Sequence, residues 1–240
     1  MCGRFTMATP TPDLQARFGI RLSEAVAPRY NVAPTEGVLA VVRGEDGREP
    51  RTLRWGLIPR GARDLKLGAR MINARTETVR SRGAFRALID DARGRALVPA
   101  DGWYEWLRAE DPRRPRQPFR FVVDDGAPFA FAGLWTQAVI DGEPVASVTI
   151  LTCPPNRVAA AVHDRMPVVL ADRDAEAAWL DPAVDGEAAQ QLCLALADER
   201  TGAHPANPRV GRAGPDNDDP GLLIPPEPAD ADADAAPTLF

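Results

Sequence analysis

Met1-Cys2-Gly3-Arg4-Phe5 opens the chain, and the rest of the sequence is organised around it. Because cysteine is small, we expect processing to remove Met1 and leave Cys2 as the mature N-terminus. A terminal cysteine carries an α-amine and a thiol on neighbouring carbons, with ordinary pKa values of about 7.7–8.0 and about 8.5. This 1,2-aminothiol can form an imine with an aldehyde and then a five-membered thiazolidine. It can also act as a thiolate nucleophile with the amine as its base, or be an inert buried cysteine.

Length and charge predict one folded domain followed by an acidic tail. The chain has 240 residues, enough to bury a sizeable core. Residues 213–240 contain seven acidic residues and no Lys or Arg; since the formal net charge is −5, residues 1–212 carry +2. We expect a domain over residues 1–225 and a disordered Ala/Asp/Pro tail over 226–240.

Several classes of protein do not fit this composition. No apolar stretch is long enough to span a bilayer and the first residues do not begin a signal peptide, so we expect a cytosolic protein. The cysteines and histidines are too few and too far apart for a disulfide framework or a zinc site. We therefore expect no metal and no cofactor. The residues concerned are Cys2, Cys153, Cys193, His163 and His204.

Lysine occurs once, at Lys66, whereas arginine is abundant. The guanidinium group is a planar, permanently charged fork that suits phosphate but does not form imines. Any Schiff base must therefore form on Lys66 or on the N-terminal amine.

Apolar patterns predict many strands and several helices. A hairpin is expected from the strands 38–43 and 51–58 with a turn at 45–48. Further strands are expected at 95–99, 104–108, 119–123, 129–135, 145–151 and 168–170. Helices are expected from Thr11 to Gly19 and at 85–91, 154–162, 173–180 and 187–198. A surface loop is expected at 60–70.

Three polar residues are candidates for catalysis. Glu105 lies between Tyr104 and Trp106, and apolar rings raise the pKa of a nearby carboxyl, as a general acid or base requires; a solvent-facing strand glutamate is the alternative. His163 is suited to moving a proton at pH 7, or it caps a helix end. Asn73 can orient a carbonyl or hydroxyl, or it belongs to a turn.

Arginines and tryptophans are candidates for binding nucleic acid. Arg4, Arg75 and Arg165 are each close in sequence to a candidate catalytic residue, a spacing that suits phosphate binding. Trp55 and Trp106 can stack on bases, or they are core residues of strands.

Seven short blocks resemble, in order, those of the SRAP family, the SOS-response-associated or abasic-site-processing proteins. The resemblance runs from Cys2 to about Ile224. The blocks are Met1-Cys2-Gly3-Arg4-Phe5, Tyr30-Asn31-Val32-Ala33-Pro34, Trp55-Gly56-Leu57-Ile58-Pro59, Asn73-Ala74-Arg75-Thr76-Glu77-Thr78, Pro99-Ala100-Asp101-Gly102-Trp103-Tyr104-Glu105-Trp106, Ala132-Gly133-Leu134-Trp135 and His163-Asp164-Arg165-Met166-Pro167-Val168.

The resemblance implies an α+β fold with a β-rich core of mixed, barrel-like sheets and peripheral helices. It implies covalent capture of abasic sites in single-stranded DNA by a monomer that is associated with the nucleoid when bound. Weak AP-lyase activity and self-proteolysis are related possibilities. By this resemblance the catalytic residues are Cys2, Asn73, Glu105 and His163, and the DNA-binding residues are Arg4, Trp55, Arg75, Trp106 and Arg165.

Two other functions remain open from the sequence. The Met-Cys-Gly start also resembles N-terminal-nucleophile glutamine amidotransferases, in which Cys2 would attack an amide. A non-covalent binder of single-stranded nucleic acid is the third reading, and its binding would fall steeply with salt.

Overall fold

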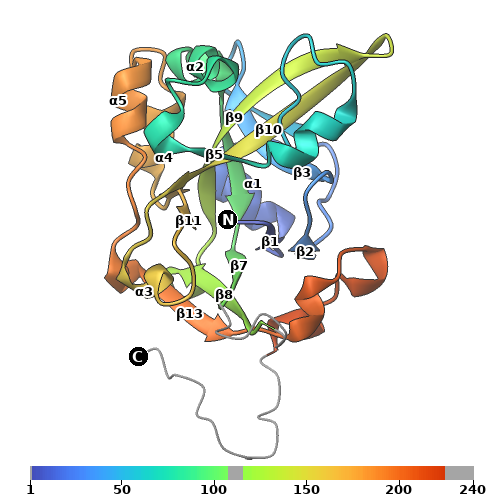
Figure 1. Ribbon diagram of the computed structural model, residues 1–240, viewed down its shortest axis with the longest axis vertical. Helices are drawn as coiled ribbons and strands as arrows, with labels where there is room; N and C mark the ends of the chain where they lie inside the picture. The colour runs from blue at the N-terminus through green and yellow to red at the C-terminus, as the bar shows by residue number, and fades with distance from the viewer. Residues whose placement is uncertain (1, 108–115, 225–240) are drawn as a thin grey trace, which may run out of the picture.

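Two β-sheets share one hydrophobic core in the computed structural model of the chain (Figure 1). The structure describes residues 2–107 and 116–224. The tail expected at 226–240 lies outside the described residues, as does Arg108 at the end of the strand expected over 104–108.

The first sheet is antiparallel throughout, with the order β13-β8-β7-β1-β2. Its central strand β7 contains the block with Glu105, and its neighbour β1 contains Arg4 and Phe5. The strands are β1 (Arg4–Met7), β2 (Arg29–Val32), β7 (Gly102–Trp106), β8 (Pro118–Val123) and β13 (Thr201–Pro205).

The second sheet closes into a five-stranded ring. Its pairings run from β3 to β4, β10, β9 and β6 and return to β3, so no edge remains open between these strands. The barrel-like sheet expected from the family resemblance is thereby confirmed. The strands are β3 (Gly37–Arg43), β4 (Arg48–Trp55), β6 (Arg95–Ala100), β9 (Phe129–Ile140) and β10 (Glu143–Cys153).

One edge of β10 is shared by two strands. β4 pairs with β10 in parallel at Ser147–Val148, and β5 (Asn73–Arg75) continues the same parallel pairing from Ile150. The chain therefore leaves the sheet after β4, runs outside it over residues 56–72, and enters it again as β5. The excursion begins at Gly56, whose φ of +125° takes the chain out of the strand.

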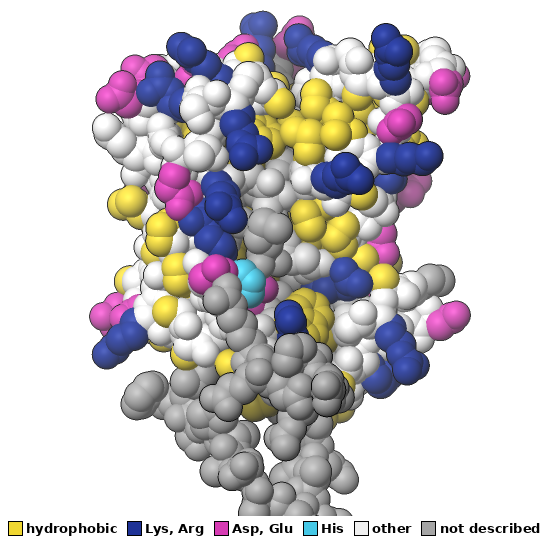
Figure 2. Space-filling view, viewed as in Figure 1, with side chains coloured by type: hydrophobic (Ala, Val, Ile, Leu, Met, Phe, Trp, Pro, Cys, Tyr) yellow, Lys and Arg dark blue, Asp and Glu magenta, His cyan; other side chains and the backbone are white. Residues whose placement is uncertain are grey.

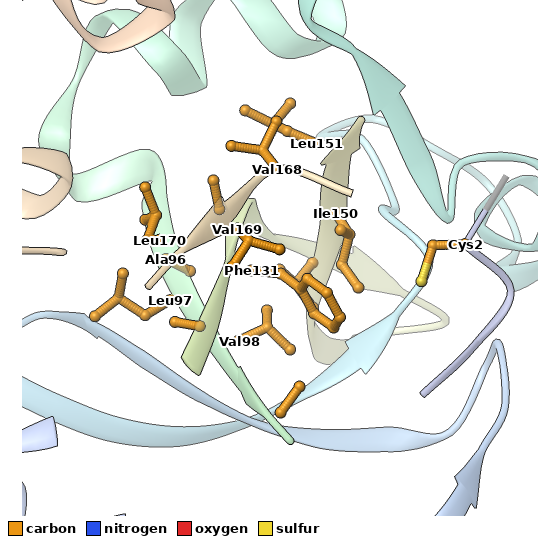
Figure 3. Packing of buried hydrophobic residues seen from close by; sticks show 14 of the residues in the cluster. Cys2, Ala96, Leu97, Val98, Phe131, Ile150, Leu151, Val168, Val169 and Leu170 are labelled. Atoms are coloured by element: carbon orange, nitrogen blue, oxygen red, sulfur yellow. The ribbon is translucent and has the colours of Figure 1, made fainter. Parts of the chain in front are cut away.

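The other edge of β10 receives a short segment that separates it from β9. β11 (Met166–Pro167) pairs with the end of β10, and β12 (Val169–Leu170) pairs with the start of β9. Between them, Val168 donates its N–H to Leu151 and accepts the N–H of Ala132. This segment, whose residues Val168, Val169 and Leu170 are labelled in the cluster of Figure 3, fixes the chain directly after Arg165.

Aromatic side chains join the two sheets. The ring of Phe5 on β1 lies 5.1 Å from that of Trp55 on β4 and 5.6 Å from that of Phe131 on β9. Trp103 on β7 stacks on Phe121 and lies edge-on to Phe131. Because these rings are buried, the sheets cannot separate without exposing them.

Helices cover the outside of this core. α2 lies against β9 and α5, and α4 packs on β6 (Figure 1). The α-helices are α1 (Thr11–Phe18), α2 (Gly83–Asp90), α3 (Arg157–Ala160), α4 (Arg173–Leu180) and α5 (Gly186–Gln191). Short 3-10 turns occur at Leu65–Arg70, Thr76–Thr78, Ala92–Gly94, Asp124–Gly126, Asp198–Arg200, Pro208–Gly211, Pro215–Asn217 and Pro220–Leu223.

Most expected elements are present, with shifted boundaries. The first helix ends at Gly19 in the left-handed conformation (φ 64°), as predicted. The helix expected over 154–162 is shorter, because the side chain of Asn156 caps it at Ala159 N. The helix expected over 187–198 ends at Gln191, after which the chain carries Leu196 into the core. β13 was not predicted.

The last described residues form a C-terminal strap, residues 207–224, across the open edge of β2. Asp218 accepts the backbone N–H groups of Tyr30 and Asn31 and pairs with Arg29. Asn31 in turn donates its side-chain amide to two carbonyls of the strap. Leu222 is fully buried, so the strap is part of the folded domain.

Candidate active site and DNA interface

The pairing of β1 with β7 brings Cys2 close to Glu105. In this pair Arg4 lies opposite Tyr104 and Phe5 opposite Trp103. The residues that precede β1 therefore approach Glu105 and Trp106. Cys2 is completely buried and Glu105 is 3% exposed. Figure 3 shows Cys2 at one margin of the apolar cluster. A thiol and a carboxyl separated by about a hundred residues thus share one buried corner.

Asp101 fixes the course of β1 beside β7. Its carboxylate accepts the backbone N–H groups of Ala8 (2.5 Å) and Thr9 (2.8 Å) and the hydroxyl of Thr6 (2.5 Å). Arg120 lies 3.4 Å from the same carboxylate. These bonds hold β1, which follows Cys2, to the start of β7, the strand that contains Glu105.

Burial sets the protonation of both groups. It raises the pKa of the Cys2 thiol well above its ordinary value, and the charge of Glu105 raises it further. Burial also raises the pKa of Glu105 to about 7, and the negative charge of Asp164 acts in the same direction. At neutral pH the sulfur is therefore a thiol, and Glu105 is poised to accept or donate a proton.

His163 faces Glu105 from the second sheet. Its Nε2 lies 4.0 Å from Glu105 Oε2. Its Nδ1 accepts the backbone N–H of Arg165 at 3.0 Å, which makes Nε2 the protonated nitrogen of the neutral ring. Asp164 Oδ1 lies 3.1 Å from Nδ1, where it would stabilise a second proton. A proton on Nδ1 would therefore replace the hydrogen bond from Arg165 with one to the Asp164 carboxylate.

The Arg165 guanidinium is held by two residues, Glu77 and Thr152. It forms a two-bond ion pair with Glu77, in which Nη2 lies 2.9 Å from Oε2. The same Nη2 donates to the carbonyl of Thr152 at 2.6 Å. The Arg165 hydrogen bond lowers the pKa of Glu77 to about 2, so this carboxylate stays charged across the physiological range.

β5 places Asn73 and Arg75 on the edge of β10. Asn73 lies opposite Ile150, and Arg75 lies opposite Thr152. The Asn73 amide donates to Ile72 O, and its buried Oδ1 accepts no hydrogen bond from the described residues. Arg75 is exposed. Asn73 therefore offers an acceptor, and Arg75 a cation.

Arg4 and Trp106 lie beside this corner on the first sheet. The Arg4 guanidinium is half-buried and donates to Gly3 O at 2.8 Å. Burial lowers its pKa, although a guanidinium remains charged at neutral pH. Trp106 is half-buried against a cluster of buried residues that contains Tyr104 and Leu222 of the C-terminal strap. Part of the residue remains accessible to solvent.

Trp55 does not face a DNA groove. Its ring is fully buried against Phe5, and its Nε1 donates to Ile72 O at 3.0 Å. A strand tryptophan with both faces packed offers no surface to a base, so Trp55 is a core residue and we leave it out of the proposed DNA interface.

Interactions connect four of the nine residues selected from the sequence: Glu105 raises the pKa of Cys2, His163 lies 4.0 Å from Glu105, and the backbone N–H of Arg165 bonds His163. Arg4 and Trp106 lie on β1 and β7 of the first sheet, and Asn73 and Arg75 lie on β5 of the second.

The structure adds four that were not selected: Glu77, Asp101, Thr152 and Asp164. Glu77, Asp101 and Asp164 lie inside the blocks that resemble the family, and this position was the only sequence signal for them. Thr152 lies outside the blocks, and only the register of β10 with β5 reveals it.

The face that contains the start of β1 is rich in cations. Figure 2 shows Lys and Arg side chains on both sides of its centre, with a histidine near the middle. Among residues 2–107 and 116–224, no group of three or more His, Cys, Asp and Glu side chains is arranged to hold a metal ion. In the same part of the chain, no helix has the length and apolarity needed to cross a membrane.

The fold and the site thus define a two-sheet α+β protein with a buried cysteine and glutamate and a partly exposed histidine beside them. A profile of the SRAP family, described as SOS response associated peptidase, matches residues 1–213. The chain belongs to this family.

Named relatives and solved structures agree with this assignment. Abasic site processing protein YoaM of Bacillus subtilis is 40% identical over 186 residues, which cover 76% of this chain and 80% of that protein. Abasic site processing protein YedK of Escherichia coli is 29% identical over 213 residues, covering 86% and 89%. A crystal structure of a Bordetella bronchiseptica protein has a TM-score of 0.73 at 28% identity, covering 86% of this chain and all of that one. A Bacteroides thetaiotaomicron structure, with a TM-score of 0.82 at 21% identity, shares the fold over 93% of this chain and 99% of that chain.

Proposed function

We propose that the protein processes abasic sites by forming a covalent thiazolidine between Cys2 and the ring-opened deoxyribose of an abasic site in single-stranded DNA. The names of its relatives support the substrate. Cysteine is the only amino acid that supplies both an amine and a thiol when it is N-terminal. One observation carries the chemistry: Cys2 lies near Glu105, whose pKa is about 7, and the His163 imidazole lies 4.0 Å from the Glu105 carboxyl.

The reaction is proposed to proceed in three balanced steps after removal of Met1. Glu105 and His163 transfer a proton from the C1′ hydroxyl to the ring oxygen, so that the sugar opens to an aldehyde. The Cys2 amine adds to this carbonyl and water leaves, which gives an imine. The Cys2 thiol then adds to the imine carbon, and its proton passes to the nitrogen.

The order of these steps follows from the protonation of Cys2. Because burial raises the pKa of its thiol, little thiolate is available to attack first. The amine is the better first nucleophile, and Glu105 can take the thiol proton in the closing step. This observation also disfavours the glutaminase reading, in which a thiolate must open the reaction.

Ring closure protects the strand. An open imine acidifies the C2′ proton and promotes β-elimination of the 3′ phosphate, whereas the thiazolidine carbon is saturated and does not. We expect weak AP-lyase activity from the fraction of the imine that does not close to the thiazolidine. Self-proteolysis would need Cys2 to attack an amide, and no contact described above favours it.

The remaining residues are proposed to bind the DNA. Arg4, Arg75 and Arg165 would hold phosphates, and Asn73 Oδ1 would accept a sugar hydroxyl. The accessible face of Trp106 would stack on a neighbouring base. Single strands are favoured because an abasic nucleotide there is reached without unpairing.

A denaturing gel tests this proposal. Protein incubated with an abasic oligonucleotide is expected to give a slower band that survives denaturation, and mass spectrometry of the adduct is expected to show loss of Met1. Cys2→Ala retains an amine but lacks the sulfur, so the stable band should disappear while strand cleavage increases. Cys193→Ala, which removes another buried thiol, should behave as the parent. A Cys2→Ala band of full intensity would reject the proposal.

A further inference from the structure

The Glu77 carboxylate forms an ion pair with the guanidinium of Arg165, the group that would bind a DNA phosphate in the proposed function. Both of its oxygens bond Arg165, whose side chain is only 11% exposed. Glu77 itself is 47% exposed, and the Thr76 hydroxyl donates to its Oε2 at 3.3 Å. The pair is therefore open to solvent on the Glu77 side and closed on the Arg165 side.

The ion pair also anchors the loop that carries His163. The backbone N–H of Arg165 is the donor to His163 Nδ1, so the place of Arg165 determines the orientation of the ring. The Thr152 carbonyl accepts a hydrogen bond from the Nη2 of Arg165 that also bonds Glu77. Thr152 lies opposite Arg75 in the pairing of β10 with β5. The Gln190 side chain fixes Thr76, next to Glu77, by donating to its carbonyl at 2.7 Å.

We propose that Glu77 is a positioning residue for His163 and, at the same time, a competitor for the DNA phosphate at Arg165. The proposal rests on the proposed function. The two roles have effects of opposite sign: Glu77 aligns the imidazole with Glu105, and its charge weakens binding of intact single strands. Misfolding would instead weaken both activities together.

Two substitutions separate the roles. Glu77→Gln removes the charge but keeps an amide oxygen for Arg165, whereas Glu77→Ala removes both. Glu49→Gln is the matched control, because Glu49 is 44% exposed, close to the 47% of Glu77, and forms an ion pair with Arg51 at 2.9 Å on the hairpin of β3 and β4.

Imidazole NMR tests the positioning role directly, since His163 and His204 are the only histidines. In protein labelled with 15N-histidine, the ring nitrogens of His163 should report the neutral form protonated at Nε2. Glu77→Ala should shift or broaden these resonances, Glu77→Gln should largely preserve them, and His204 should not respond. Unchanged His163 resonances in Glu77→Ala would reject the positioning role.

Binding and reaction rates test the competition. With an undamaged oligonucleotide, both Glu77 variants should bind about two- to fivefold more tightly than the parent, as expected for release of one partly exposed cation. At saturating abasic DNA, the rate of adduct formation should fall about tenfold or more in Glu77→Ala and recover in Glu77→Gln. His163→Ala combined with Glu77→Ala should be no slower than His163→Ala alone.

The outcomes distinguish this proposal from the function on which it rests. If the parent forms no adduct, the proposed function fails, while the NMR and the binding of undamaged DNA still decide the role of Glu77. If the parent reacts and Glu77→Ala neither slows the reaction nor tightens binding, the role of Glu77 is rejected. Equal weakening of binding and rate would also reject it.

Discussion

Glu105 combines almost complete burial with a pKa of about 7, which suits proton transfer at neutral pH. Burial of a carboxyl disfavours its charged form, so this residue must destabilise the folded chain wherever it is ionised. The site therefore retains a group that lowers stability in return for reactivity.

The stability cost of Glu105 is predicted to depend on pH. The pKa of Glu105 is about 7 in the folded chain and 4.5 ordinarily, so between pH 4.5 and pH 7 Glu105 keeps its proton in the folded chain and loses it in the unfolded chain. Stability should therefore fall as pH rises through this window, by on the order of 3 kcal/mol above pH 7. Glu105→Gln should remove this fall in urea unfolding measured from pH 4 to 8. Glu199→Gln, at an exposed position, should follow the parent curve, and parallel curves for both variants would contradict the prediction.

The sequence predicted a raised pKa for Glu105, as the structure has it, but for an incomplete reason. Its aromatic neighbours Tyr104 and Trp106 suggested a raised pKa, but burial also depends on β1, which comes from the far end of the chain. Trp55 shows the limit of such reasoning. An accessible and a buried strand tryptophan have the same local sequence pattern, and only the contacts with Phe5 and Ile72 separate them.

Among the elements, β2 depends on a segment of low apolar content. Asp218 of the C-terminal strap supplies acceptors to Tyr30 and Asn31 at an edge that has no further strand. The same strap reaches Trp106 through the cluster with Leu222. The family match ends at residue 213, so these contacts lie beyond it.

Removal of the Asp218 carboxylate is predicted to loosen β2. Asp218→Ala would leave the N–H groups of Tyr30 and Asn31 without an acceptor, and should lower the free energy of unfolding by about 1–3 kcal/mol. Asp216→Ala is the control, because Asp216 is exposed and its side chain has no partner among the described residues. Chemical denaturation measures both, and equal values for the two variants would argue against a role for the strap.

Elements with strong local patterns were predictable, and those defined by a partner were not. The hairpin of β3 and β4 follows from its β-branched runs and turn, and it was confirmed by the register. β13 reads Thr-Gly-Ala-His-Pro, which has little strand propensity, and it is a strand because it pairs with β8.

For the whole molecule, the site requires both sheets in fixed relation. Cys2 precedes β1 and Glu105 lies on β7 of the antiparallel sheet, whereas Asn73 lies on β5 and His163 precedes β11, both beside β10. Local patterns do not reveal which distant strands meet, so only the family resemblance grouped these residues before the structure did.

The core that joins the sheets is predicted to unfold as one unit. Phe5→Ala removes a ring that contacts both Trp55 and Phe131, and should lower the free energy of unfolding by about 3–5 kcal/mol. Tryptophan fluorescence and far-ultraviolet circular dichroism should still report one shared transition. Leu194→Ala, at a 70% exposed position, should change little. Two separate transitions in the parent would show that the sheets unfold independently.

The excursion at residues 56–72 has a practical consequence. It contains Lys66, the only lysine of the chain, at an exposed position outside both sheets. Amine-directed dyes therefore have a single side-chain attachment point, on the segment that connects β4 with β5. A fluorophore on Lys66 would let one follow single molecules as they bind DNA, once the α-amine of Cys2, which such dyes also modify, has been reversibly protected.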